Sequence, residues 1–66
     1  MEVRYPNVHV KLVGLDGNAF SILGRVLRAM RAAHVPKDEM EKFSKDAMSG
    51  DYDHLLQTVI RWVDAE

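Results

Sequence analysis

Cysteine is absent from this chain of 66 residues, proline occurs twice and tryptophan once. Without cysteine, neither disulfides nor thiolate metal ligands can supplement the hydrophobic core. No apolar run approaches the roughly 20 residues of a membrane-spanning helix, and the first residues form no apolar segment of signal-peptide length. These absences predict a cytoplasmic protein that does not enter a membrane.

The chain is also short for an independent domain. A single domain formed by residues 1–66 buries only about 60% of the surface that its unfolded form exposes, so its stability is marginal. Small domains without disulfides or metal ions often gain buried surface by self-association. The size therefore favours a homodimer.

Charge is unevenly distributed although the net charge is only −1. Residues 1–37 carry six Lys and Arg against two acidic residues, and residues 38–66 carry three against eight. The two halves are expected to attract each other, within the fold or across a dimer. A nucleic-acid surface is the alternative, and the nearly neutral total does not favour it.

Residues 8–13 predict a half-buried β-strand, because Val8, Val10 and Leu12 alternate with the residues between them. The backbone of this strand needs a hydrogen-bonding partner. Three partners are possible: residues 2–5 folded back through Pro6 and Asn7, the tail 62–66, or the same strand of a second subunit. We favour a short N-terminal hairpin or a ribbon between two subunits.

Three amphipathic helices follow, and the first is the most regular. Gly14 and Gly17 permit a tight turn with positive φ, and Asn18 is a good N-cap for a helix over residues 19–33. Gly24 interrupts this helix, and the close approach of another backbone is one possible reason. The apolar arc of the helix consists of Phe20, Ile22, Leu23, Val26, Leu27, Ala29, Met30 and Ala33.

The second helix begins after Val35-Pro36, with Asp38 and Glu39 where the helix dipole favours negative charge. Its narrow apolar stripe is Met40, Phe43, Ala47 and Met48. The third helix follows Ser49-Gly50-Asp51, with Asp51 as N-cap. Its apolar arc is wider than one packing seam needs and comprises Leu55, Leu56, Val59, Ile60, Trp62 and Val63.

Two short segments contain residue types used in active sites, but neither has the required spacing. Residues 14–18 lie between a strand and a helix, yet they lack both the Walker lysine and the three-glycine dinucleotide pattern. Asp51, Asp53 and His54 have no second histidine at ligand spacing. We therefore expect no catalytic residue, no metal ion, no cofactor and no enzymatic activity.

Arg25, Arg28 and Arg31 form a slanted basic row on the exposed side of the first helix. Arginine favours planar recognition of carboxylates and phosphates, so the row is a candidate contact for an acidic protein partner. A strand followed by helices also invites comparison with ribbon-helix-helix DNA-binding dimers, in which His9 and Lys11 would face outward. The glycine-containing turn, the third helix and the acidic second half depart from that pattern.

Residues 10–20 (VKLVGLDGNAF), Val35-Pro36 and residues 49–55 (SGDYDHL) resemble a group of short bacterial or phage-associated proteins. The resemblance spans nearly the whole chain and implies a bacterial or viral cytoplasmic setting for a stand-alone domain. It implies no activity, cofactor or functional residue.

Together these patterns predict an α+β domain with an N-terminal β-element and three helices. The predicted function is a non-enzymatic protein-interaction module that forms a homodimer, with Arg25, Arg28, Arg31, His9 and Lys11 as partner-binding residues. A small nucleic-acid-binding regulator of ribbon-helix-helix type is the alternative.

Overall fold

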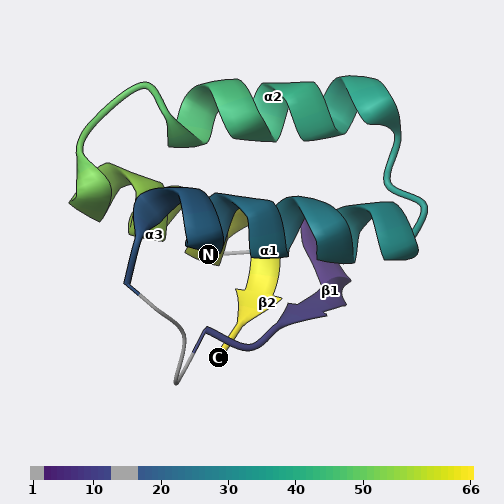
Figure 1. Ribbon diagram of the computed structural model, residues 1–66. Coiled ribbons are helices and arrows are strands. Elements are labelled where there is room, and N and C mark those ends of the chain that lie inside the picture. Colours follow the sequence, from purple (N-terminus) through teal and green to yellow (C-terminus); the bar gives the residue numbers. More distant parts are fainter. Residues whose placement is uncertain (1–2, 13–16) are drawn as a thin grey trace.

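The computed structural model describes residues 3–12 and 17–66. Strand β1 (Tyr5–Val10) comes first, and helices α1 (Ala19–Ala32), α2 (Lys37–Ala47) and α3 (Tyr52–Trp62) follow. Strand β2 (Val63–Ala65) begins directly where α3 ends. The α+β class and the order of strand and three helices are therefore confirmed (Figure 1).

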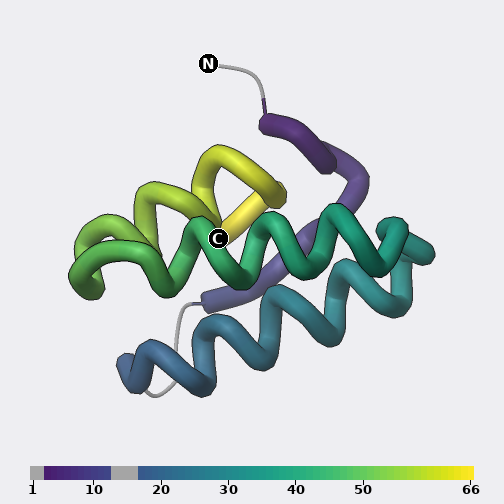
Figure 2. Tube along the Cα trace, turned by 90° about the horizontal axis from the view of Figure 1, so that it is seen from above, coloured from purple at the N-terminus to yellow at the C-terminus, as the bar shows by residue number. Residues whose placement is uncertain are grey.

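Helices α1 and α3 form a middle layer, with α2 on one side and the two strands on the other (Figure 1). Seen from above, α1 and α2 run alongside each other in opposite directions (Figure 2). All five elements contribute to one apolar core. Its members include Val8, Val10, Ile22, Val26, Met30, Phe43, Ala47, Leu55, Val59 and Val63.

The helix N-termini follow from local sequence. The side chain of Asn18 accepts a hydrogen bond from the amide of Phe20 at 2.8 Å, and that of Asp51 accepts from the amide of His54 at 2.9 Å. Both predicted N-caps are confirmed. Pro36 caps α2 without a side-chain hydrogen bond, since proline has none to offer.

The strand pairing differs from the prediction. β1 covers Tyr5–Val10 and not residues 8–13. Tyr5, which the predicted hairpin placed in a separate pairing segment, is part of β1 itself. The partner of β1 is β2, which lies in the tail and runs parallel to β1. The predicted hairpin is therefore wrong. Of the three partners considered, the tail is the one found within the chain. The amide of Glu66 donates to the carbonyl of Val10 at 2.8 Å, and the amide of Leu12 donates to the carbonyl of Glu66 at 2.7 Å.

The pairing of β1 with β2 is irregular. Tyr5 is opposite Val63 but His9 is opposite Asp64, so the register shifts between them. The amides of Arg4 and Leu12 both donate to the C-terminal part of the chain. Between the two paired stretches, at Pro6 and Asn7, the ladder is interrupted.

The turn between α1 and α2 contains a residue in the left-handed region. His34 has φ 64°, its amide donates to the carbonyl of Arg31, and the amide of Val35 donates to the carbonyl of Met30 at 3.0 Å. These two bonds form a Schellman motif, which usually has glycine at this position. Gly17, which was expected to have positive φ, does not, and Gly14 lies outside the described residues.

Candidate interaction surfaces

Arg4, Tyr5, Glu39 and Trp62 form a cluster that joins β1, α2 and α3; we call it the closed cluster. Arg4 Nε donates to Glu39 Oε1 at 2.7 Å, and the hydroxyl of Tyr5 donates to the same oxygen at 2.9 Å. The guanidinium of Arg4 lies 4.8 Å from the centroid of the Trp62 ring, and Tyr5 stacks on that ring. The guanidinium of Arg4, the hydroxyl of Tyr5 and the carboxylate of Glu39 therefore all have partners within the chain.

The closed cluster shifts the pKa of its ionisable groups in consistent directions. The pKa of Glu39 is lowered because Arg4 and then Tyr5 donate hydrogen bonds to its carboxylate, whose side chain is only 12% exposed. The pKa of Tyr5 is raised, first by burial and then by its hydrogen bond to Glu39. These directions fit an ion pair that stabilises the fold.

His9 pairs with Asp64, the residue opposite it on β2, with 2.7 Å between Nδ1 and Oδ2. The Arg4–Glu39 and His9–Asp64 pairs both join the basic first half of the chain to its acidic second half, as the charge distribution predicts. His9 remains exposed, but a carboxylate now lies beside it.

His54 is the centre of a second polar cluster that sequence reasoning missed. Its Nε2 lies 2.9 Å from the carbonyl of Asp46, 3.3 Å from Asp46 Oδ1 and 3.2 Å from Ser49 Oγ. A catalytic triad needs serine and carboxylate on different ring nitrogens, and here both approach the same one. The cluster therefore ties the end of α2 to α3; the only sequence signal was a histidine shortly after Ser49-Gly50.

The basic row of α1 is exposed along its whole length, but its members do not share one face. Each step of three residues turns the helix surface by about 60°, so Arg25 and Arg31 lie roughly 120° apart around the axis. Within the described part of the chain, no carboxylate forms an ion pair with Arg25, Arg28 or Arg31. Of the three, Arg31 lines a groove.

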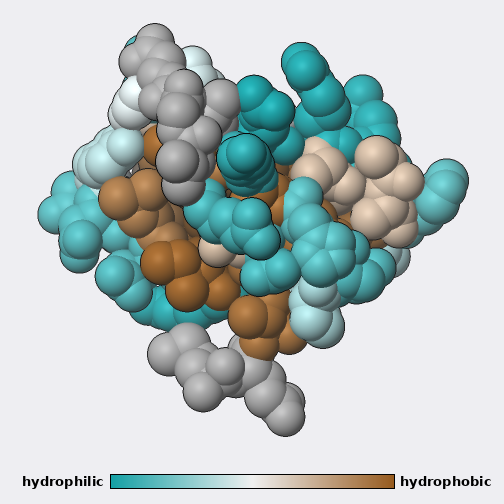
Figure 3. Space-filling view, turned by 90° about the horizontal axis from the view of Figure 1, so that it is seen from below, coloured by the Kyte–Doolittle hydropathy of each residue, from teal (hydrophilic) through white to brown (hydrophobic). Residues whose placement is uncertain are grey.

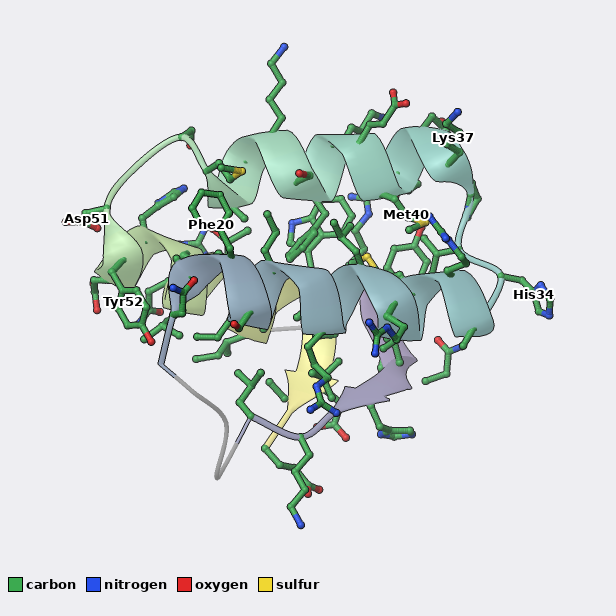
Figure 4. The ribbon with its side chains drawn as sticks, in the orientation of Figure 1. Phe20, His34, Lys37, Met40, Asp51 and Tyr52 are labelled. Atoms are coloured by element: carbon green, nitrogen blue, oxygen red, sulfur yellow. The ribbon has the colours of Figure 1, made fainter. Side chains whose placement is uncertain are left out.

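This groove lies between the end of α1 and the start of α2 and has a volume of ≈ 710 Å³. Its floor is apolar, from Leu27, Val35 and Met40. Charged and polar residues surround the floor: Arg31, His34, Lys37, Glu41 and Ser44. In Figure 4, Met40 lies between the two helices, and His34 projects outward from the turn that joins them.

A second hollow lies at the other end of the α1–α2 pair and is more apolar. Phe20, Met48 and Tyr52 line it, and all three are exposed, Phe20 to 71%. Ile60, two turns further along α3, is 52% exposed, as the wide apolar arc of this helix suggested. In Figure 3, hydrophobic atoms gather on the left of the lower face, the side on which α3 lies.

The outer edge of β1 is a further surface. Because Val10 and Leu12 direct backbone groups toward the tail, the backbone groups of His9 and Lys11 face the opposite edge. β1 is the margin of a two-stranded sheet in the part of the chain that the structure describes (Figure 1). The side chains of His9 and Lys11 are both exposed.

Comparison with protein-family models, with curated proteins and with solved structures gives no match. The resemblance to short bacterial and phage-associated proteins stays a prediction, and residues 13–16 of its first segment lie outside the described residues. Among residues 3–12 and 17–66, no group of three His, Cys, Asp or Glu side chains is arranged to hold a metal ion. None of the described helices has the length and apolar character needed to cross a bilayer.

Proposed function

We propose that this chain is a non-enzymatic protein-interaction module that forms a homodimer through the outer edge of β1. The observation that carries the proposal is the direction of the backbone groups of His9 and Lys11, which face away from β2. An exposed strand edge is a template for another strand, and pairing of identical strands about a two-fold axis gives a closed dimer.

Packing supports the same proposal. A sheet of only two strands is marginal, and β2 has only three residues. Pairing of β1 with β1 of a second copy gives a sheet of four strands, with the tails at its two margins. Such pairing adds hydrogen bonds without disturbing the buried side chains of Val8 and Val10.

The proposal of a non-enzymatic role draws on the polar clusters. The carboxylate of Glu39 is saturated by Arg4, Tyr5 and Lys42. The ring of His54 is occupied by backbone and side-chain oxygens of Asp46 and Ser49. Both arrangements hold elements together, and neither leaves a reactive group aimed at a cavity.

A ribbon-helix-helix regulator would use the same β1 edge, so DNA binding is the competing outcome of a dimer. The position of Asp64 favours the protein-interaction role, because its carboxylate lies 2.7 Å from the His9 ring and repels phosphate. A titration with duplex DNA at two salt concentrations separates the roles, since phosphate contacts make binding strongly salt-dependent.

Substitution of Lys11 tests the dimer. Lys11→Pro removes the N–H that faces the open edge, whereas Lys11→Ala removes the same charge but keeps that N–H. Size-exclusion chromatography with light scattering should give a mass twice the 7.5 kDa of the chain for the unmodified protein and for Lys11→Ala. Lys11→Pro should be a monomer with an unchanged circular dichroism spectrum.

Two outcomes contradict the proposal. The first is a monomer at all concentrations of the unmodified chain up to the millimolar range. The second is equal dissociation by Lys11→Ala and Lys11→Pro, which would assign the contact to the lysine charge instead of the strand edge.

A further inference from the structure

We infer that the α1–α2 groove is a docking site for an acidic amphipathic helix of a partner protein, and that this helix crosses α1 at Gly24. The inference concerns the face formed by α1 and α2, not the strand edge, and does not rest on the proposed dimer. Helices commonly bind in this way, with the apolar face of the ligand helix in a groove between two helices.

Gly24 is the first observation behind this inference. It lies inside α1, where glycine disfavours the helix, and it is exposed. A Cβ built at this position meets no atom within 4 Å, so nothing in the described fold requires glycine there. The missing side chain does leave room for the backbone of a partner to approach α1 closely.

Along α1, Gly24 lies between the two hollows and lines neither; we call the two hollows with Gly24 between them the strip. At about 100° per residue, Phe20, Leu27 and Arg31 all lie within roughly 60° of Gly24 around α1. The antiparallel α2 contributes Ser44 and Met40 along the same strip, and its C-cap contributes Met48. From Phe20 to Arg31 the strip extends about 16 Å along α1, which is three turns of a docked helix.

Charge selects the kind of helix. Arg31 and Lys37 lie at one end of the strip with His34, and within residues 3–12 and 17–66 neither Arg31 nor Lys37 has an ion-pair partner. Glu41 is the one carboxylate in the lining of this groove, so positive charge is in excess there. An acidic helix would neutralise both residues. A second copy that met this surface about a two-fold axis would instead bring another Arg31 and Lys37 into the same interface.

A designed peptide tests the inference directly. The probe is a fluorescein-labelled helical peptide of about 15 residues, with leucine at every third or fourth position and glutamate along both flanks. Its control is the same peptide with lysine in place of each glutamate. Fluorescence anisotropy should show the acidic peptide binding about tenfold more tightly than the basic one, and Arg31→Gln with Lys37→Gln should abolish this preference.

Gly24→Ala tests the crossing point. The added Cβ should weaken binding of the acidic peptide at least fivefold or so while it raises the melting temperature of the isolated chain. Gln57→Ala, which changes an exposed residue of α3 outside both hollows, should leave peptide binding unchanged. Weaker binding together with a higher melting temperature would show that the added Cβ blocks the peptide and does not damage the fold.

Three results overturn the inference: no binding of the acidic peptide, equal affinity for the acidic and basic peptides, or undiminished binding by Gly24→Ala. A change in the oligomeric state of the chain alone on Gly24→Ala would also overturn it, because the occupant would then be a second copy. Lys11→Pro should not change peptide binding, so failure of the proposed dimer and failure of this docking site are distinguishable.

Discussion

Arg4 and Arg31 carry the same guanidinium group in opposite surroundings. Arg4 donates to Glu39 and lies over Trp62, while Arg31 lines a groove and forms no ion pair with a described carboxylate. The closed cluster thus pairs Arg4 and Tyr5 with Glu39, a residue far from both in the sequence. A second region, which we call the open side and define by Gly24, Arg31 and His34, leaves its groups to solvent or to another molecule.

The closed cluster and the open side should respond to substitution with opposite changes in stability. Residues of the closed cluster contact one another across β1, α2 and α3, so changing them should destabilise the fold. Gly24 and His34 are conformationally unfavourable where they lie, so replacing them with better-suited residues should stabilise it. Loss of stability on substitution in the closed cluster and gain on the open side would distinguish a region that holds the fold together from one retained for binding.

The largest expected effect is that of Trp62→Ala. The ring of Trp62 stacks on Tyr5 at 6.2 Å, meets Phe43 edge-on at 5.6 Å and lies beneath Arg4. Its loss should cost about 3 kcal/mol in the free energy of unfolding, a large part of what so short a chain has. Urea denaturation followed by circular dichroism measures the loss.

Ile60→Ala is the control for Trp62→Ala, since Ile60 is on the same helix and is 52% exposed. Its effect should stay within about 0.5 kcal/mol. Similar losses from both substitutions would mean that the aromatic contacts add nothing beyond the area of one apolar side chain.

The pH dependence of stability is the next expected effect. Because hydrogen bonds from Arg4 and Tyr5 lower the pKa of Glu39 in the folded chain, its contribution is complete above the unfolded value of about 4.3. That contribution is lost as the pH falls through the folded value. The urea midpoint should therefore fall between pH 6 and pH 3, and Glu39→Gln should flatten this fall.

Glu41→Gln tests whether the effect belongs to Glu39. Glu41 is an exposed carboxylate of the same helix and lines the groove on the open side. Its substitution should leave the pH dependence as steep as in the unmodified chain. If the two substitutions flatten it equally, the dependence reflects net charge and not the closed cluster.

The helices were predictable from sequence because their signals are local. Asn18 and Asp51 mark two helix starts by side-chain capping, and the structure has both bonds. The apolar periods of α1 and α3 needed no knowledge of the rest of the chain. The predicted first helix exceeds the observed one by a single residue, Ala33, which is its C-cap.

The strand pairing was not predictable because it depends on contacts across the whole chain. Trp62 and Val63 continue the apolar period of α3, so the sequence gives no reason to end the helix between them. The helix ends there because Val63 pairs with Tyr5. Such pairing joins residues 58 positions apart, and local propensity carries no information about it.

The candidate site was predictable in part. The sequence identified Arg31 as exposed and basic, but only the structure shows that it lines a groove with Lys37 while Arg25 and Arg28 do not. The partner of Glu39 could not be read from its helix, because Arg4 lies 35 residues away. Gly24 was visible in the sequence, and the structure adds that the space around it is open.

On the open side, Gly24→Ala should raise the free energy of unfolding by up to about 1 kcal/mol, because alanine favours the helix and its Cβ meets nothing. Thermal denaturation measures the change. Gly50→Ala is the matched control, since a Cβ there would lie 2.9 Å from Cβ and Cγ of His54 and must displace that ring. It should therefore destabilise the chain. Stabilisation by both substitutions would contradict this prediction, because it would show that the close contact between the added Cβ at position 50 and His54 costs no stability.

His34→Gly is the smallest expected effect and completes the comparison. Glycine adopts φ 64° without the cost that a side chain incurs, but it also gives the unfolded chain more freedom, so the net gain should be below about 1 kcal/mol. His34→Ala keeps the unfavourable conformation and should be nearly neutral. Urea midpoints of the three proteins separate these effects. Equal stabilisation by alanine and glycine would mean that the imidazole side chain itself is unfavourable. The left-handed backbone at position 34 would then not be the reason why substitution stabilises the open side.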